Sequence, residues 1–116
     1  MISLLGIGTA GENIVDCFQG NKEYDCYVVS DNVQRSSKYR RKIKRQDKLE
    51  DYETCVPDLT KFFSGVNEHV QVFVCGAGRT ANATLAILKH LQGKTIDIFY
   101  IQPDTELLMG MNKLQE

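Results

Sequence analysis

The chain has 116 residues, of which 42% are hydrophobic and 25% are charged, and its formal net charge is −1. This length suits one domain with a modest core, and the balanced composition excludes disordered and fibrous proteins. No apolar run approaches the roughly 20 residues of a membrane span, and the N-terminus lacks the pattern of a secretory signal.

Strand and helix patterns alternate along the first half of the chain. The apolar run 2–7 stops at glycine and predicts a strand, and the amphipathic stretch 10–18 predicts a helix. The run 24–31 is β-branched and aromatic, which predicts a second strand. Residues 33–56 are polar and charged without a clear period, so we expect a loop there.

The alternation continues in the second half. Hydrophobic spacing predicts a helix over 56–66, a strand over 70–75, a helix over 80–93, a strand over 95–102 and the start of a helix over 104–116. Leu85, Leu88 and Leu91 are expected on the apolar face of the 80–93 helix, which Gly93 closes. We therefore expect one α/β domain over 1–116: a Rossmann-like three-layer sandwich whose mostly parallel sheet has helices on both faces.

Four segments are expected at the carboxyl ends of the strands, where such sheets bind ligands. They are the first glycine loop (6–11), the turn 30–32, the second glycine loop (76–82) and the turn 102–104. We expect all four to line a single pocket.

The first glycine loop contains Gly6, Gly8 and Gly11 in a G-x-G-x-x-G pattern between a predicted strand and helix. Glycine lets an anion approach the backbone, and a helix N-terminus offers free N–H groups, so the pattern predicts phosphate binding. The alternative is a tight turn with close helix–strand packing. Asp31 follows Gly11 by 20 residues, where an acid binds ribose in dinucleotide-binding domains; the weaker alternative is that it turns the chain or caps a short helix.

The second glycine loop offers Gly76, Gly78, the hydroxyl of Thr80 and a further predicted helix N-terminus. Arg79 could add a charge to a phosphate. Two loops of this type are less usual than one in a dinucleotide-binding domain.

The pairing of the two loops resembles the N-terminal nucleotide-binding domain of the tubulin/FtsZ family. The stretch "GIGTAGEN" has Gly8, Gly11 and Asn13 in places like those of the family's first phosphate loop, and "SDN" resembles its Asn/Asp-rich turn. "GAGRTAN" stands where the family has its glycine-rich signature loop, after a strand and before a helix. It departs from that signature at Ala77, Arg79, Ala81 and Asn82.

The resemblance implies binding of GTP or GDP, with Mg²⁺ accompanying the triphosphate. It also implies self-association or a larger assembly, in which the next subunit supplies a catalytic carboxylate. The central helix that reads the base and the second domain are expected beyond residue 116, so we expect little or no hydrolysis by this chain alone. Asp104 and Glu106 are the acids that the resemblance suggests near the ribose.

The expected nucleotide-binding residues come from all four segments, and no catalytic residue or metal ligand is expected. They are Gly6, Gly8, Thr9, Ala10, Gly11, Asn13, Asp31, Asn32, Gly76, Ala77, Gly78, Arg79, Thr80, Ala81, Asn82, Asp104 and Glu106. Two alternatives stay open: a Rossmann-type domain that binds NAD(P), and a nucleotide-free assembly module with a degenerate site.

The basic segment, residues 38–48, holds seven of the chain's 14 lysines and arginines. We interpret it as a solvated loop balanced by the acids that follow. Nucleic acid is the weaker interpretation, because Tyr39 is the only interleaved aromatic residue, and a position near a terminal phosphate is another.

The four cysteines are widely spaced, with no C-x-x-C pair and no histidine at ligand spacing. This spacing argues against zinc. Buried free thiols fit a reducing compartment, so we expect a cytoplasmic protein.

Overall fold

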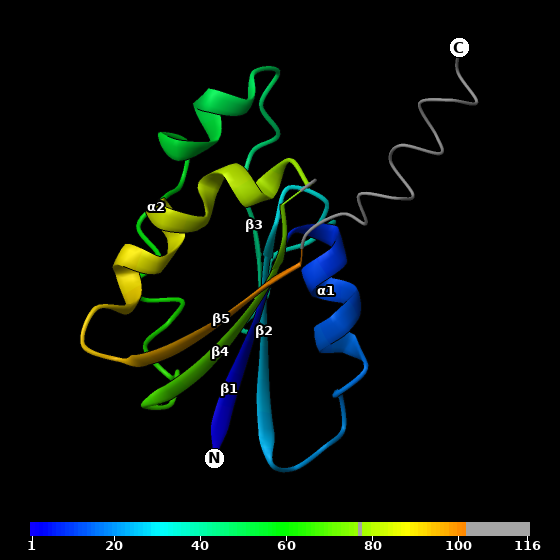
Figure 1. Cartoon of the computed structure of the whole chain (residues 1–116), viewed down its shortest axis with the longest axis vertical. Coiled ribbons are helices and arrows are strands. Elements are labelled where there is room, and N and C mark those ends of the chain that lie inside the picture. Colours follow the sequence, from blue (N-terminus) through cyan, green and yellow to red (C-terminus); the bar gives the residue numbers. More distant parts are fainter. Residues whose placement is uncertain (77, 102–116) are drawn as a thin grey trace.

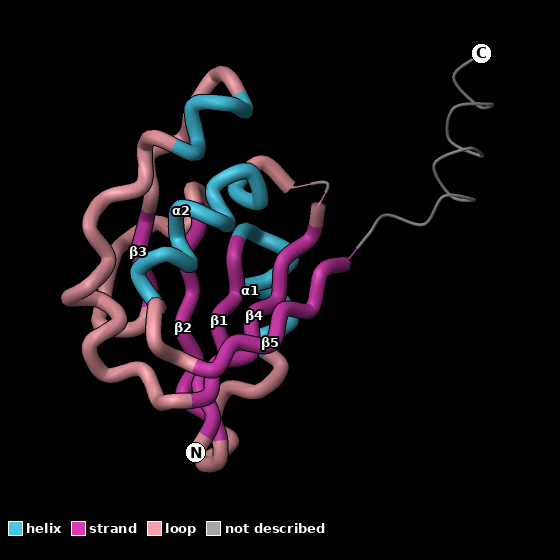
Figure 2. The backbone as a smooth tube through the Cα atoms, turned by 60° about the vertical axis from the view of Figure 1, so that its left-hand side comes forward, coloured by secondary structure: helices cyan, strands magenta, loops and turns pink. Residues whose placement is uncertain are grey.

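Five parallel strands form the central sheet of the structure, a computed structural model that describes residues 1–76 and 78–101. The strands are β1 (Ile2–Ile7), β2 (Tyr24–Ser30), β3 (Arg40–Lys42), β4 (His69–Cys75) and β5 (Thr95–Ile101). Their order across the sheet is β3-β2-β1-β4-β5, with β3 and β5 on opposite sides (Figure 2). From β1 the chain first adds β2 and β3 on one side, and then adds β4 and β5 on the other side of β1.

Helices lie on both faces of this sheet. The helix α1 (Gly8–Asp16) connects β1 to β2 on one face, and α2 (Thr84–Leu88) connects β4 to β5 on the opposite face (Figure 1). The change of face follows from the change of direction, because parallel crossovers are right-handed. The predicted α/β sandwich with a parallel sheet is confirmed.

Alternating side chains of the strands form two cores, one on each face. On the α2 face, Leu5 and Ile7 of β1 pack with Val70, Val72 and Val74 of β4 in the larger core. The smaller core on the α1 face contains Leu4, Val15, Cys26, Val28 and Val33. The four strands that sequence patterns predict are all present, within a residue of their expected ends.

The stretch 33–56 is more ordered than the loop we expected. It contains β3, which pairs with β2, and a 3-10 helix over Leu49–Glu53. Val33, Ile43 and Tyr52 are buried and fix the stretch to the two cores. Isolated apolar residues among many charges give no periodic signal, so the strand and the anchors were missed.

Two predicted helices differ from the structure. The segment 56–66 contains only turns, with one helical hydrogen bond from the Phe63 N–H to the Leu59 carbonyl. The helix expected over 80–93 is split into the 3-10 helix Thr80–Ala83, α2 and the 3-10 helix Lys89–Leu91. Its buried face includes Ile87 and Leu91, whereas Leu85 is 79% exposed, so the apolar face was predicted wrongly at Leu85.

The outermost strand β5 exposes most of its apolar residues. Ile98, Phe99, Tyr100 and Ile101 are 38–57% exposed, although Phe99 stacks on Phe73 of β4. Within the described ranges, no helix combines the length and apolar character needed to cross a membrane.

Candidate functional site

A cavity of about 430 Å³ lies beyond the carboxyl ends of β1, β2 and β4. Its lining residues are Gly8, Thr9, Ala10, Asn13, Asp31, Arg45, Cys75, Gly78, Arg79 and Thr80. We call this space the glycine-loop cavity. It lies where the strand order reverses between β1 and β4, which is the usual ligand position in open α/β sheets, and its volume suits a small ligand.

The three glycines of the first loop have two different roles. A Cβ atom on Gly6 would lie 2.5 Å from the Gly11 carbonyl oxygen, and one on Gly11 would overlap the carbonyl of Phe73. These two glycines therefore let α1 pack directly on the sheet. Gly8 has φ +79 and lines the cavity, so it alone combines a glycine-specific conformation with access to a ligand. The tight-turn interpretation therefore applies at Gly6 and Gly11, while phosphate binding at Gly8 stays a prediction.

The N-terminus of α1 faces the cavity through Gly8, Thr9 and Ala10. The residue before the helix, Ile7, provides no side-chain cap, so the N–H groups of the first turn have no capping acceptor from it. Together with the helix dipole, these N–H groups favour an anion at this position.

The second glycine loop meets the first at Thr80. The Thr80 Cβ lies 3.4 Å from where a Cβ of Gly8 would be, and Thr80 itself is only 2% exposed. The loop does not lead into a long α-helix as we expected, because Thr80–Ala83 is a 3-10 turn and α2 has five residues. The second loop therefore contributes its backbone, the Thr80 hydroxyl and Arg79 to the cavity, but only a small helix dipole.

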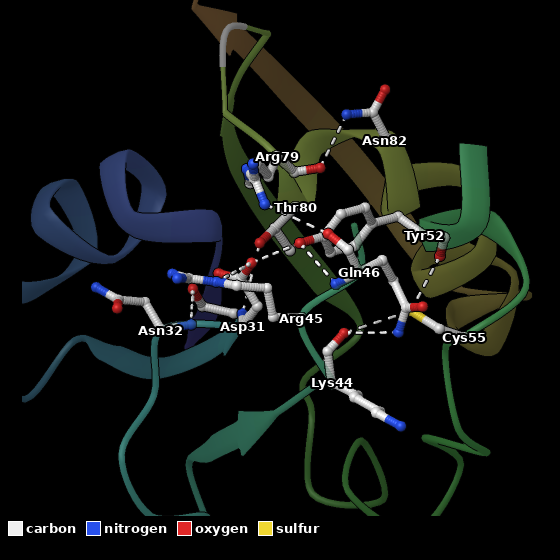
Figure 3. A network of polar contacts seen from close by, with 11 residues as sticks. Asp31, Asn32, Lys44, Arg45, Gln46, Tyr52, Cys55, Arg79, Thr80 and Asn82 are labelled. Atoms are coloured by element: carbon white, nitrogen blue, oxygen red, sulfur yellow. Dashed lines mark hydrogen bonds and ion pairs between the residues drawn. The ribbon is translucent and has the colours of Figure 1, made fainter. Parts of the chain in front are cut away.

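Asp31 is held by residues of the stretch 33–56 (Figure 3). Its Oδ2 accepts a hydrogen bond from the Tyr52 hydroxyl at 2.7 Å and lies 3.5 Å from Nε of Arg45. Its backbone N–H lies 3.5 Å from Oγ1 of Thr80, which joins the end of β2 to the second loop. The Asp31 side chain is 7% exposed, so its charge is balanced mainly by protein groups.

The basic segment contributes Arg45 to the cavity lining and is bonded to Tyr52 and Arg79 through the next residue, Gln46. The Tyr52 hydroxyl accepts a hydrogen bond from the Gln46 N–H at 3.2 Å, and Arg79 donates to the Gln46 carbonyl at 3.3 Å (Figure 3). Burial raises the pKa of the neighbouring Cys55 thiol, which keeps it protonated at neutral pH. The position of this segment near the loops was one of our interpretations, but the roles of Arg45 and Tyr52 were missed because both depend on long-range contacts.

The structure brings together three of the four segments expected at this site. Eight of the expected residues line the cavity, and their contact with a nucleotide stays a prediction: Gly8, Thr9, Ala10, Asn13, Asp31, Gly78, Arg79 and Thr80. Gly6, Gly11, Asn32, Gly76, Ala81 and Asn82 are not among its lining residues. Ala77, Asp104 and Glu106, with the turn 102–104 and the helix expected over 104–116, lie outside the described residues.

Asn32 and Asn82 have local roles instead. The Asn32 N–H donates to the Ser30 hydroxyl, and the Asn82 side chain donates to the Arg79 carbonyl at 2.9 Å, which stabilises the second loop. Gly76 lies against the ring of Tyr100 rather than against the cavity.

A scan against models of known protein families finds no match for this chain, and a search of curated proteins finds none either. The resemblance to tubulin and FtsZ therefore rests on the loop residues themselves.

Proposed function

We propose that the glycine-loop cavity binds the phosphate groups of a nucleotide, with GTP or GDP as the preferred ligand. The observation that carries the proposal is the convergence of the α1 N-terminus and the second glycine loop on one cavity at the reversal of strand order. A phosphate there would meet backbone N–H groups from α1 and the hydroxyl of Thr80.

The charges around the cavity support an anionic ligand. Arg45 and Arg79 both line it, and among the described residues Asp31 is the only acidic one in its lining. Because Asp31 already has Tyr52 and Arg45 as partners, its negative charge opposes a phosphate less than a free carboxylate would. Arginine also recognises phosphate well, since its planar guanidinium donates two parallel hydrogen bonds.

The contacts of Asp31 favour GTP over NAD(P). In a dinucleotide-binding domain the acid after the second strand must accept hydrogen bonds from ribose. Here Oδ2 of the corresponding carboxylate is already engaged by Tyr52 and Arg45, which leaves Oδ1 for a ribose hydroxyl and works against a contact through both oxygens. The strand order is nevertheless that of dinucleotide-binding domains, so NAD(P) stays the second candidate.

The lining residues do not fit a protein-bound Mg²⁺. The ion usually takes carboxylates together with phosphate oxygens, and the one carboxylate that the described part of the chain places in the lining is paired with Arg45. Among the described residues there is also no group of three or more potential metal-ligating side chains. We therefore expect any Mg²⁺ to be bound by the triphosphate, and hydrolysis by this chain alone to be slow or absent.

The proposal includes assembly in the cytoplasm. Hydrolysis in the tubulin/FtsZ manner would need a carboxylate from another subunit, so we propose that the protein self-associates or joins a larger assembly. The four cysteines are all free, which is compatible with a reducing compartment.

Calorimetric titration with GTP, ATP and NAD in the presence of Mg²⁺ tests the proposal. The informative variant is Gly8→Ala, and Gly20→Ala is its matched control, because Gly20 also has a positive φ (+86) but lies away from the cavity with open space around it. Both variants strain the backbone, but only Gly8→Ala places a methyl group between the loops. We expect the unchanged protein to bind GTP. Gly8→Ala should weaken this binding at least tenfold, and Gly20→Ala should leave it unchanged.

The other outcomes select among the alternatives. Binding of NAD without GTP would support the dinucleotide-binding domain. Absence of binding by all three ligands, with self-association in sedimentation, would support the nucleotide-free assembly module. Equal losses in both glycine variants would contradict the position of the ligand.

A further inference from the structure

A second cavity, of about 640 Å³, lies on the α2 face of the sheet near β2 and β3. It is lined by Tyr27, Ser37, Lys38, Arg41, Asp58, Lys61, Phe62, Ser64 and Gly65. We call it the aromatic–basic cavity. It shares no lining residue with the glycine-loop cavity, and the proposed function makes no use of it.

In the described ranges of the chain, three cationic side chains line this cavity, against one carboxylate. They are Lys38, Arg41 and Lys61, and the carboxylate is that of Asp58. The Asp58 carboxylate already accepts a hydrogen bond from the Thr60 N–H and lies 3.9 Å from His90. Like charges that gather without matching counter-charges repel one another, so this arrangement favours an anionic ligand.

The neighbouring strand residue shows the contrast. Arg40 points to the opposite face, where its guanidinium pairs with Glu12 at 2.7 Å and Asp16 at 2.6 Å. Alternation along β3 thus sends Arg40 to two protein carboxylates and Arg41 to a cavity with excess positive charge.

Aromatic rings accompany these cations. Phe62 and Tyr27 both line the cavity, with ring centroids 5.7 Å apart, and Tyr39 packs on Tyr27 at 5.2 Å. Tyr39 is 40% exposed, and the Lys38 ammonium lies 5.3 Å from the centre of its ring. The linear sequence shows little aromatic interleaving of the basic segment, but folding brings rings from β2 and from the segment 56–66 beside it.

We propose that the aromatic–basic cavity binds a nucleotide unit, with the base against Phe62 and the phosphate among Lys38, Arg41 and Lys61. Rings beside cations are the usual combination for single-stranded nucleic acid, since bases stack on the rings and phosphates meet the charges. The same chemistry would hold a free mononucleotide, so the two sources are separated by experiment.

Fluorescence anisotropy with a labelled oligothymidylate of about 12 nucleotides tests the proposal over a series of salt concentrations. We expect saturable binding by the full chain. The double variant Arg41→Gln/Lys61→Gln should lower the slope of log K against log salt by about 0.7, because the cavity holds one phosphate and each phosphate contact on a single strand contributes about 0.7. The control Lys22→Gln/Lys89→Gln removes the same charge from exposed positions outside the cavity and should leave the slope unchanged.

A ring variant separates stacking from charge. Phe62→Leu should weaken binding about fivefold without changing the salt slope, which corresponds to the loss of one weakly stacked base. Circular dichroism confirms that each variant is folded. Gly8→Ala should bind the oligonucleotide normally, so failure here is distinguishable from failure of the proposed GTP site.

Competition identifies the source of the nucleotide. Displacement by thymidine monophosphate at millimolar concentration supports a free nucleotide, and displacement only by unlabelled oligonucleotide supports a strand. Equal displacement by polyglutamate would overturn the proposal in favour of an acidic protein partner. No saturable binding at low salt, or equal losses in the cavity and control variants, would also overturn it.

Discussion

The Tyr52 hydroxyl joins the basic segment to the candidate phosphate site, and Tyr52→Phe removes it without changing the shape of the ring. The ring is fully buried, and the hydroxyl donates to Asp31 at 2.7 Å and accepts from the Gln46 N–H at 3.2 Å. A hydrogen bond to a charged group is worth about 1.5–3 kcal/mol, and an unpaired backbone N–H costs about 1 kcal/mol or more. Arg45 remains beside Asp31 and offsets part of this loss.

We therefore expect Tyr52→Phe to lower the free energy of unfolding by about 2–3 kcal/mol, or the melting temperature by about 8–12 °C. Urea unfolding followed by circular dichroism measures this change, since the chain has no tryptophan. GTP affinity should fall as well, because Gln46 loses its bond to Tyr52 and the adjacent Arg45, which lines the cavity, is held less firmly.

The matched control is Tyr39→Phe, because the Tyr39 ring is 40% exposed. We expect that control to change stability by no more than about 0.5 kcal/mol. Equal effects of the two variants would falsify the idea that the Tyr52–Asp31 contact fixes the basic segment.

Three further predictions concern the fold around the site. Gly11→Ala should lower the free energy of unfolding by about 3 kcal/mol or more in urea unfolding, because its methyl group would overlap backbone atoms. In the control Gly78→Ala the added methyl group would be at an ordinary contact distance, so the free energy of unfolding should change by less than about 1 kcal/mol. Arg40→Gln should cost about 1 kcal/mol at low salt and less in 1 M NaCl, since its two ion pairs are partly exposed; no salt dependence would contradict this. Burial raises the pKa of the Cys26 thiol and so lowers its thiolate fraction at pH 8. Disulfide-exchange reagents at that pH should therefore label the exposed Cys17 before Cys26. Faster labelling of Cys26 would refute its burial.

The sheet could be predicted from local patterns because four of its five strands have an unambiguous signal. The runs that form β1, β2, β4 and β5 are apolar or β-branched and end at glycine or polar residues. β3 consists of three basic residues and is stabilised by pairing with β2 and by the ion pairs of Arg40, which no window along the sequence contains. The segment 56–66 is the reverse case: its apolar residues have the spacing of a helix, but they pack into the larger core from a series of turns.

The candidate site divides in the same way. The glycine loops were predictable because a strand end and a helix start are local features, and parallel topology then brings them together. The contacts of Asp31 could not be predicted, because its partner Tyr52 lies 21 residues away in a stretch without hydrophobic periodicity. Asp31 lines the cavity with Oδ2 already bonded to Tyr52, and its contact with a ligand stays a prediction.

The division of roles among the glycines of the first loop has a consequence for how this protein could change during evolution. Selection for stability alone would retain Gly6 and Gly11, because a side chain at either position would collide with backbone. A descendant that no longer bound the ligand would thus keep Gly6 and Gly11. Substitutions would instead accumulate at Gly8, Gly78 and Arg79. In a set of related chains, variation at those three positions, rather than the presence of the glycine pattern, would separate chains that bind from those that have stopped binding.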